Sequence, residues 1–267
     1  MAFLQVNYFS KSLWRQTAFH LCLPNDVPIE WREGNTCYER PMKTLMLLQG
    51  YSGNTFDWPL GTLISDIAVR HNIAVIMPSG DNSFYLNAKG CCFKYADFVG
   101  FELLDYVRNT FNLSKEAKDT FIAGLSMGGF GAIHSGLEHP ERYGKIIGLS
   151  SALIVNRLKD IKPGEKDDIA DYDYYCQVFG DLKKVKETTN DPEFIINERL
   201  KKGDKIQPIF MACGSEDYLL DTNREFRDFL LEKNVDLTYK ESPGIHDWIF
   251  WNEYLEPAIK WALDEEV

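Results

Sequence analysis

A short apolar run that ends in a glycine-rich turn and passes at once into a helical pattern is the strongest constraint in this sequence. The run from Thr120 to Ala123 is followed by Gly124-Leu-Ser-Met-Gly128. In a strand–turn–helix context, this G-x-S-x-G spacing predicts a sharp turn with Ser126 at its tip. The two glycines omit side chains that would collide with the neighbouring strand and helix. We therefore expect the Ser126 hydroxyl at the carboxyl edge of a sheet, beside the free N–H groups of a helix start.

The rest of the chain alternates apolar runs with amphipathic patterns. Short apolar runs bounded by turn residues predict strands at 17–23, 44–48, 73–77, 145–150, 208–213 and 237–241. Helical periodicity predicts helices at 60–71, 95–110, 127–138, 191–202, 221–234 and 248–263. In the second of these, Phe101 is expected on the apolar side. This alternation predicts an α/β fold with a mostly parallel sheet and right-handed crossovers.

Chain length bounds the number of domains. A chain of 267 residues has room for one large α/β domain or two small ones. The long polar stretch 155–205 lies between two predicted core strands. We expect a single domain over residues 1–267, in which 155–205 is an insertion or cap-like region over the edge of the sheet that carries Ser126.

Charge and composition limit the partners. The formal net charge of −11 argues against nucleic acid or an anionic membrane and suits a small-molecule substrate. The chain has no run of about 18 apolar residues that could span a membrane, and its N-terminus lacks signal-peptide features. Its six cysteines have no metal-binding spacing. We expect reduced thiols in a cytoplasmic protein, although a secreted chain without its leader would look the same. A homo-oligomer is compatible with the sequence.

Ser126 needs a base, because a serine hydroxyl is a weak nucleophile at neutral pH. In this strand–turn–helix architecture the partners follow in the chain order serine, acid, histidine. Of the five histidines, two precede the serine and two lie on the helix that leads away from it. His246 remains, on a loop before the last predicted helix, and we predict that it is the base.

The acid is expected on a loop that follows a late strand and precedes the histidine. Glu216 and Asp217 both meet this condition, because they come directly after the 208–213 strand. Asp247, next to the histidine, is instead expected to cap the final helix.

An oxyanion intermediate needs two backbone N–H donors. One is expected at Met127, immediately after the serine. The other is expected after the 44–48 strand, where Gly50 lets the backbone approach closely; Tyr51 is favoured, with Ser52 as the alternative. Neither a G-x-x-x-x-G-K-[ST] phosphate loop nor an H-E-x-x-H metal motif occurs in the sequence. We expect no metal or organic cofactor.

These segments together resemble the esterase D / tributyrin esterase group of α/β-hydrolases, whose wider family includes S-formylglutathione hydrolases and acetyl-xylan and feruloyl esterases. The resemblance covers most of the chain and is carried by Leu47-Leu-Gln-Gly-Tyr-Ser-Gly-Asn54, Phe121 to Gly131, Val178-Phe-Gly180, Cys213-Gly-Ser-Glu-Asp-Tyr-Leu219 and His246-Asp-Trp248. It implies an α/β-hydrolase fold, with a mostly parallel central sheet flanked by helices. In that family the aspartate of C-G-x-E-D is the triad acid, which falls on Asp217. One departure is Gln49, where the family usually has a histidine; the resemblance then implies a different pocket polarity.

These expectations describe a serine carboxylesterase that hydrolyses short-chain acyl esters through Ser126, His246, Asp217 and an acyl-enzyme. The alternatives are an S-formylglutathione-type thioesterase, an esterase that removes acetyl or feruloyl groups from plant polysaccharide, and a non-catalytic α/β binding domain. The aromatic segments at 84–85 and 172–175 either line the pocket or belong to the core. Cys91 and Cys92 are expected to be inert.

Overall fold

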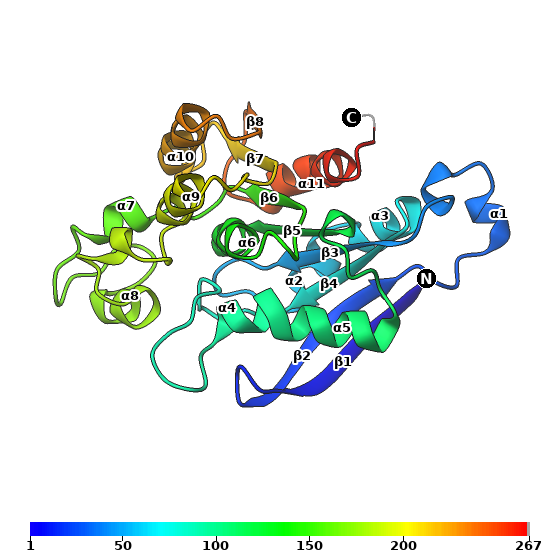
Figure 1. Ribbon diagram of the computed structural model, residues 1–267, viewed down its shortest axis with the longest axis horizontal. Coiled ribbons are helices and arrows are strands. Elements are labelled where there is room, and N and C mark those ends of the chain that lie inside the picture. Colours follow the sequence, from blue (N-terminus) through cyan, green and yellow to red (C-terminus); the bar gives the residue numbers. More distant parts are fainter. Residues whose placement is uncertain (266–267) are drawn as a thin grey trace.

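A mixed sheet of eight strands runs through the computed structural model, which describes residues 1–265. The strands are Ala2–Ser10 (β1), Arg15–Leu23 (β2), Lys43–Leu48 (β3), Ile73–Pro78 (β4), Thr120–Leu125 (β5), Lys145–Leu149 (β6), Ile209–Gly214 (β7) and Leu237–Ser242 (β8). Their order across the sheet is β1-β2-β4-β3-β5-β6-β7-β8 (Figure 1). The β1–β2 and β2–β4 pairs are antiparallel, and all other neighbours are parallel.

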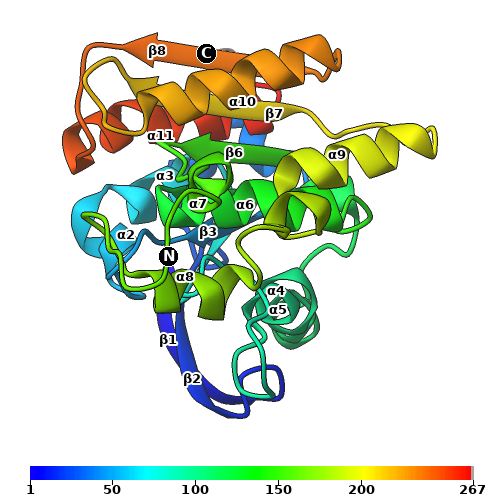
Figure 2. The ribbon, with the colours of Figure 1, turned by 90° about the vertical axis from the view of Figure 1, so that its left-hand side faces the viewer.

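Helices connect the strands and cover both faces of the sheet (Figures 1 and 2). They are Ile29–Arg32 (α1), Asp57–Gly61 (α2), Ile64–Arg70 (α3), Tyr95–Asp97 (α4), Leu103–Phe111 (α5), Met127–Glu138 (α6), Val155–Leu158 (α7), Tyr172–Phe179 (α8), Pro192–Lys201 (α9), Leu220–Glu232 (α10) and Trp248–Ala262 (α11). Short 3-10 turns occur at Thr36–Tyr38 (η1), Ala117–Asp119 (η3) and Val185–Glu187 (η4), and a π-helical turn at Phe98–Glu102 (η2). Within the described residues, no helix is both long and apolar enough to cross a bilayer.

The central strands are buried on both faces, because their side chains alternate between two apolar layers. In β3, Leu45 and Leu47 join the layer formed with α2, α3 and α11. Met46 and Leu48 join the opposite layer, which contains α5, α6 and α10. Strands buried on both faces therefore have continuous apolar sequences. The predicted α/β class with a mostly parallel sheet is confirmed.

The antiparallel edge differs from this pattern, and β1 was missed in the sequence. Along β1, partly buried residues alternate with exposed ones from Ala2 to Phe9. Only one face of this strand is covered, so its sequence mixes apolar and polar residues and lacks the unbroken apolar run of the central strands.

The single helix predicted at 60–71 is wrong. The chain forms α2 and α3 instead, separated by an extended Thr62 (φ −142°, ψ 172°). The Thr62 hydroxyl accepts the N–H of Ile64, the first residue of α3, at 3.1 Å. The extended backbone at Thr62 interrupts a periodicity that would otherwise favour one continuous helix.

The helix predicted at 95–110 forms, but with a π-helical turn at Phe98–Glu102 between α4 and α5. The extra residue in a π turn rotates the side chains that follow relative to those before. Phe101, expected on the apolar side, is accordingly 42% exposed. Glu102, at the end of the turn, accepts the N–H groups of Lys11 and Ser12 in the β1–β2 hairpin.

The segment 155–205 contains α7, α8, η4 and α9 (α7 and α8 lie at the left of Figure 1 and toward the viewer in Figure 2). Its inner side belongs to the core, since Tyr175 and Phe179 are almost completely buried. Phe179 packs against Phe84 with ring centroids 5.0 Å apart. Between α7 and α8 a small loop closes on itself through an antiparallel bridge from Lys166 to Asp171.

Candidate active site

β5 ends in a turn whose backbone is strained at Ser126. This residue has φ 53° and ψ −120°, a conformation that costs a residue with a Cβ about 1–3 kcal/mol. The turn is also crowded: a Cβ on Gly124 would lie 2.2 Å from the Gly128 carbonyl oxygen, and one on Gly128 would lie 2.3 Å from that of Leu48. The Ser126 N–H donates to the Leu149 carbonyl at 2.9 Å. Close packing therefore holds the serine at the start of α6.

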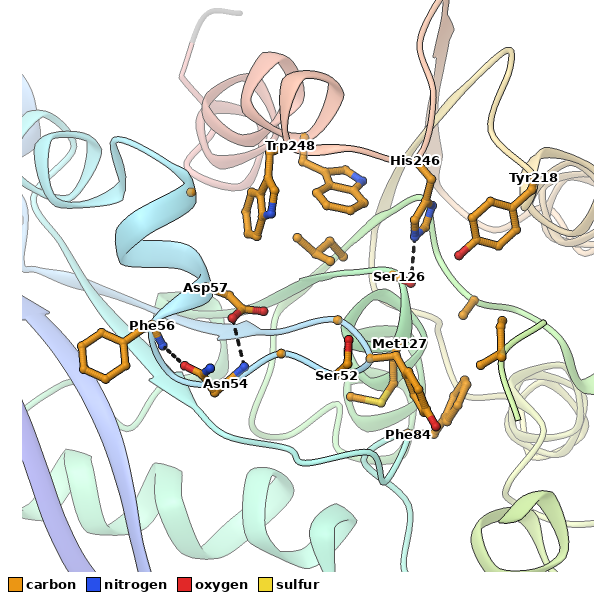
Figure 3. A pocket seen from close by; sticks show the side chains of 18 of the residues that line it. Ser52, Asn54, Phe56, Asp57, Phe84, Ser126, Met127, Tyr218, His246 and Trp248 are labelled. Atoms are coloured by element: carbon orange, nitrogen blue, oxygen red, sulfur yellow. Dashed lines mark hydrogen bonds between the residues drawn. The ribbon is translucent and has the colours of Figure 1, made fainter. Parts of the chain in front are cut away.

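Three loops at the carboxyl edge of the sheet bring a serine, a histidine and a carboxylate into one hydrogen-bonded chain. His246 lies between β8 and α11, and its Nε2 is 3.0 Å from the Ser126 Oγ (Figure 3). Its Nδ1 is 2.9 Å from Oδ2 of Asp217, on the loop after β7. Although 120 residues separate the serine from the histidine, the parallel strands deliver both to the same edge.

Asp217 is closed off from solvent and held in its ionised form. Its side chain has no exposed area, and its second oxygen accepts the Leu219 N–H at 2.8 Å. Burial alone would raise the pKa of this carboxyl, but the hydrogen bonds from His246 and Leu219 outweigh burial and lower the pKa below its ordinary value. A carboxylate at Nδ1 favours the tautomer that leaves the Nε2 lone pair facing Ser126.

Glu216, the other acid considered from the sequence, does not contact the histidine. Its Oε2 accepts the Gly244 N–H at 2.6 Å, which ties the loops after β7 and β8 together. Asp247 accepts two N–H groups in the first turn of α11, as expected for a helix cap.

Two backbone N–H groups next to Ser126 are available for a ligand. Within residues 1–265, the N–H groups of Met127 and Tyr51 donate to no protein acceptor. The Ser52 N–H donates to Oδ1 of Asn82 at 2.8 Å, so this alternative is already engaged.

The loop after β3 packs directly on the Ser126 turn. A Cβ on Gly50 would lie 2.7 Å from the Leu125 side chain, which only glycine avoids. Gln49 is buried and its Nε2 donates to the Gly53 carbonyl at 2.8 Å. The amide therefore shapes the 50–53 turn from which Tyr51 presents its N–H.

A cleft of about 780 Å³ opens above the serine. The residues predicted for the serine, histidine and oxyanion positions line it, and Asp217 lies behind His246. Further lining residues were missed in the sequence: Leu60, Asp168 and Ile169, together with Asp57, Tyr218 and Trp248, which Figure 3 labels. Tyr218 and Trp248 could have been found as the direct neighbours of the predicted acid and of the helix cap. The other four carry no local signal.

The two aromatic segments have different roles. Phe84 lines the cleft, whereas Tyr85 is fully buried and its hydroxyl accepts the Gln49 N–H at 3.0 Å. In the segment 172–175, Tyr174 packs edge-on against Tyr51 with centroids 5.8 Å apart. This segment supports the loop after β3 from outside the cleft.

Two carboxylates make the cleft wall acidic. Asp57 comes from α2, and Asp168 comes from the loop between α7 and α8. Burial raises the pKa of Asp57 above its ordinary value, although the Asn54 N–H opposes the shift. In a chain of net charge −11, these groups disfavour anionic ligands.

Comparisons with known proteins agree with this architecture. Residues 10–262 match the sequence model of the Esterase family. The chain is 39% identical over 261 residues to an acetyl esterase of Caldicellulosiruptor saccharolyticus, covering 98% of each protein. Among solved structures, it matches FphF, a fluorophosphonate-binding serine hydrolase of Staphylococcus aureus (TM-score 0.83, 31% identity, 98% of each chain covered). It also matches the S-formylglutathione hydrolase FrmB of the same organism (TM-score 0.81, 30% identity, 98% of each chain covered). This chain therefore belongs to the Esterase family, and it is a carboxylic ester hydrolase of the α/β-hydrolase fold.

Proposed function

We propose that the chain is a serine carboxylesterase that hydrolyses short-chain acyl esters through Ser126, His246 and Asp217. The observation that carries this proposal is the continuous hydrogen-bonded series from Ser126 Oγ through His246 to the buried Asp217. A serine becomes an effective nucleophile when a base of this kind accepts its proton.

In the first half of the reaction, Ser126 Oγ attacks the ester carbonyl while His246 Nε2 takes the hydroxyl proton. The C–O bond to the alcohol then breaks, and the imidazolium returns the proton to the leaving oxygen. The N–H groups of Met127 and Tyr51 donate to the oxyanion, whose charge develops in the transition state.

In the second half, His246 removes a proton from water, which attacks the acyl-enzyme. When the tetrahedral intermediate collapses, the bond to Ser126 Oγ breaks, the imidazolium returns its proton to that oxygen, and the acid is released. Asp217 stabilises the imidazolium in both halves and keeps its ring oriented.

Short acyl groups are favoured by the similarity to the acetyl esterase of Caldicellulosiruptor saccharolyticus. An S-formylglutathione-type thioesterase is the second candidate, favoured by the match to FrmB. The carboxylates of Asp57 and Asp168 on the cleft wall weigh against a negatively charged glutathione conjugate. We also propose that the chain works as one domain, since Asp168 brings the 155–205 segment to the catalytic cleft.

Covalent labelling with a fluorophosphonate, mapped by mass spectrometry, tests the nucleophile. We expect one label on Ser126 and none in the Ser126→Ala variant. Labelling of another residue, or none in active enzyme, would remove the proposed mechanism. Turnover of p-nitrophenyl acetate, S-formylglutathione and acetylated xylan then separates the substrate classes, and we expect the neutral acetyl esters to be preferred.

A further inference from the structure

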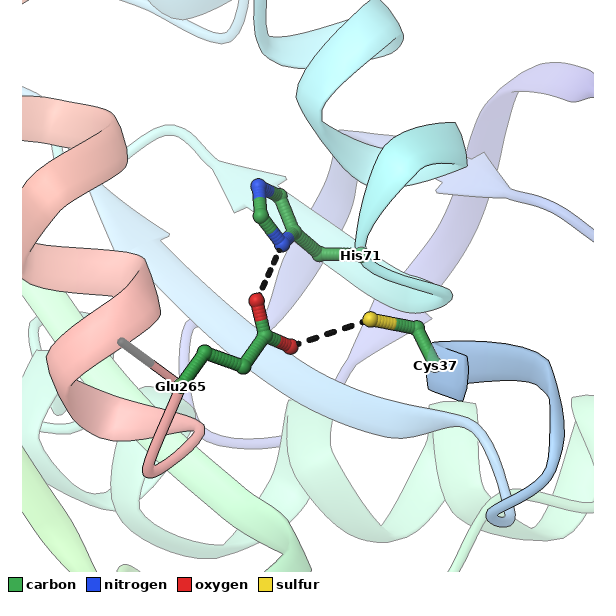
Figure 4. Close-up of side chains that lie close together, drawn as sticks. All are labelled: Cys37, His71 and Glu265. Carbon is green, nitrogen blue, oxygen red and sulfur yellow. Dashed lines mark hydrogen bonds and ion pairs between the residues drawn. The ribbon is translucent and has the colours of Figure 1, made fainter. Parts of the chain in front are cut away.

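Three potential metal ligands meet at the edge of the sheet opposite the catalytic cleft. Cys37 lies in η1, His71 follows α3 just before β4 begins, and Glu265 follows α11 (Figure 4). The Sγ of Cys37, a ring nitrogen of His71 and a carboxylate oxygen of Glu265 lie within 4.8 Å of one another. Since α11 starts at the cleft and runs away from it, this cluster is separate from the esterase site.

The Glu265 carboxylate already contacts both of the other residues. Glu265 Oε2 is 2.7 Å from His71 Nδ1, and its Oε1 accepts the Cys37 thiol at 3.1 Å. Donors around a tetrahedral zinc ion are separated by about 3.4–3.8 Å, given the usual Zn–N, Zn–O and Zn–S bond lengths. With Oε2 of Glu265 as the ligand, its 2.7 Å contact with His71 Nδ1 would open by less than about 1 Å to reach that separation.

The surroundings of His71 match those of a metal-binding histidine. Its ring is 93% buried, as its side chain is only 7% exposed. Its Nε2 is 2.9 Å from Oε1 of Glu256, and a carboxylate at the second nitrogen orients a ligating imidazole and leaves Nδ1 for the metal. Arg40 Nη2, at 3.3 Å from Oε1 of Glu265, similarly holds the carboxylate in place.

We propose that Cys37 Sγ, His71 Nδ1 and the Glu265 carboxylate bind a zinc ion, with water as the fourth ligand. Thiolate, imidazole and carboxylate are the ligands that zinc takes in proteins. When Zn²⁺ binds, it displaces the proton from the Cys37 thiol and the proton shared between His71 and Glu265. Both protons go to solvent, and the zinc keeps its oxidation state.

Such an ion would fasten the chain after α11 to η1 and to the end of α3. These segments are far apart in the sequence, with 228 residues between Cys37 and Glu265. Because the ligands come together only in the folded chain, binding would stabilise the native state. Their separation also explains why cysteine spacing gave no metal signal.

Cobalt(II) titration tests the site, because a tetrahedral thiolate site produces a thiolate-to-cobalt charge-transfer band and strong visible bands. Cys91 and Cys92 have sulfurs 3.5 Å apart and are a competing thiol pair, so the experiment uses the Cys91→Ser/Cys92→Ser background. We expect stoichiometric cobalt binding, displacement of cobalt by zinc, and a higher Tm with zinc.

The variants Cys37→Ser and His71→Gln should each abolish the charge-transfer band and the zinc-dependent rise in Tm, whereas the partly buried Cys176→Ser serves as the matched control and should retain both. Circular dichroism and turnover of p-nitrophenyl acetate check that each variant is folded. Absence of stoichiometric binding in the background protein would overturn the proposal, as would a charge-transfer band that persists in folded Cys37→Ser.

Discussion

The loops that carry Ser126, Asp217 and His246 differ in construction from the 155–205 segment, although both reach the same cleft. The loops that carry these three residues are short, follow strands of the sheet and are held by contacts that exclude even one extra carbon, as at Gly128. The loop between α7 and α8 projects from the sheet, and Asp168 and Ile169 bring it to the cleft. Closely packed loops thus hold the proposed catalytic residues, and a separate segment contributes part of the cleft wall.

The largest difference is expected between Ser126→Ala, which removes the proposed nucleophile, and Ile169→Ala, which changes only the cleft wall. We expect Ser126→Ala to lower kcat by roughly 10⁴–10⁶ without changing the fold. Ile169→Ala should change kcat/KM for a short acetyl ester by less than about tenfold, the scale of a lost apolar contact. Initial rates with acetyl and longer acyl p-nitrophenyl esters check both. Equal losses in the two variants would show that the wall takes part in the chemistry.

The two adjacent acids on the β7 loop form a matched pair. Asp217→Asn should lower kcat by about 10⁴, because an amide no longer holds the imidazole in the required tautomer. Glu216→Gln keeps an acceptor for the Gly244 N–H, so we expect a loss of less than about tenfold. Similar large losses in both would assign Glu216 a direct part in catalysis. Far-UV circular dichroism controls for misfolding.

Alanine substitutions at two glycines, one next to Ser126 and one in the 155–205 segment, compare how tightly the two regions are packed. In Gly128→Ala the new Cβ would meet the Leu48 backbone oxygen at 2.3 Å, so we expect a loss of more than about 3 kcal/mol in the free energy of unfolding. Gly164 has φ +82° but no atom within 4 Å of an added Cβ, so its alanine variant should cost about 1 kcal/mol of backbone strain. Urea unfolding measures both, and the reverse ranking would contradict the proposed crowding.

Acid should destabilise the fold through His134, a buried residue of α6. Burial lowers the pKa of His134 to about 4 from 6.5, although its hydrogen bond to the Thr189 carbonyl of the 155–205 segment opposes the shift. Because the unfolded chain binds this proton more readily, the stability is fully present above about pH 6.5 and is lost as pH falls toward 4, by up to about 3 kcal/mol. His134→Gln should lack this contribution. Urea unfolding from pH 7.5 to 4.5 measures the free energy of unfolding of both proteins. If this free energy changes with pH by the same slope in both, the prediction is refuted.

The fold was predictable where burial on both faces leaves an unbroken apolar run, as from Leu45 to Leu48. It was less predictable where one face is covered, as in β1, or where a single extended residue such as Thr62 divides a helical segment. The placement of His246 followed from chain order and strand polarity. The catalytic roles and the oxyanion donors remain predictions.

The residues of the cleft wall were harder to predict from the sequence. Asp168 and Ile169 belong to no pattern of period or spacing, and their place depends on how α8 packs on the core through Tyr175 and Phe179. Likewise Cys37, His71 and Glu265 are brought together only by the tertiary structure. Contacts between segments so far apart leave no pattern in the local sequence.

The direction of α11 has a practical consequence for attaching the enzyme to a support. The helix starts beside His246 and continues for 15 residues, which carries the chain about 22 Å away from the serine. A tether fused after this helix would leave the mouth of the cleft open to bulky or polymeric esters. The same tether would adjoin Glu265, one of the three ligands of the proposed zinc site.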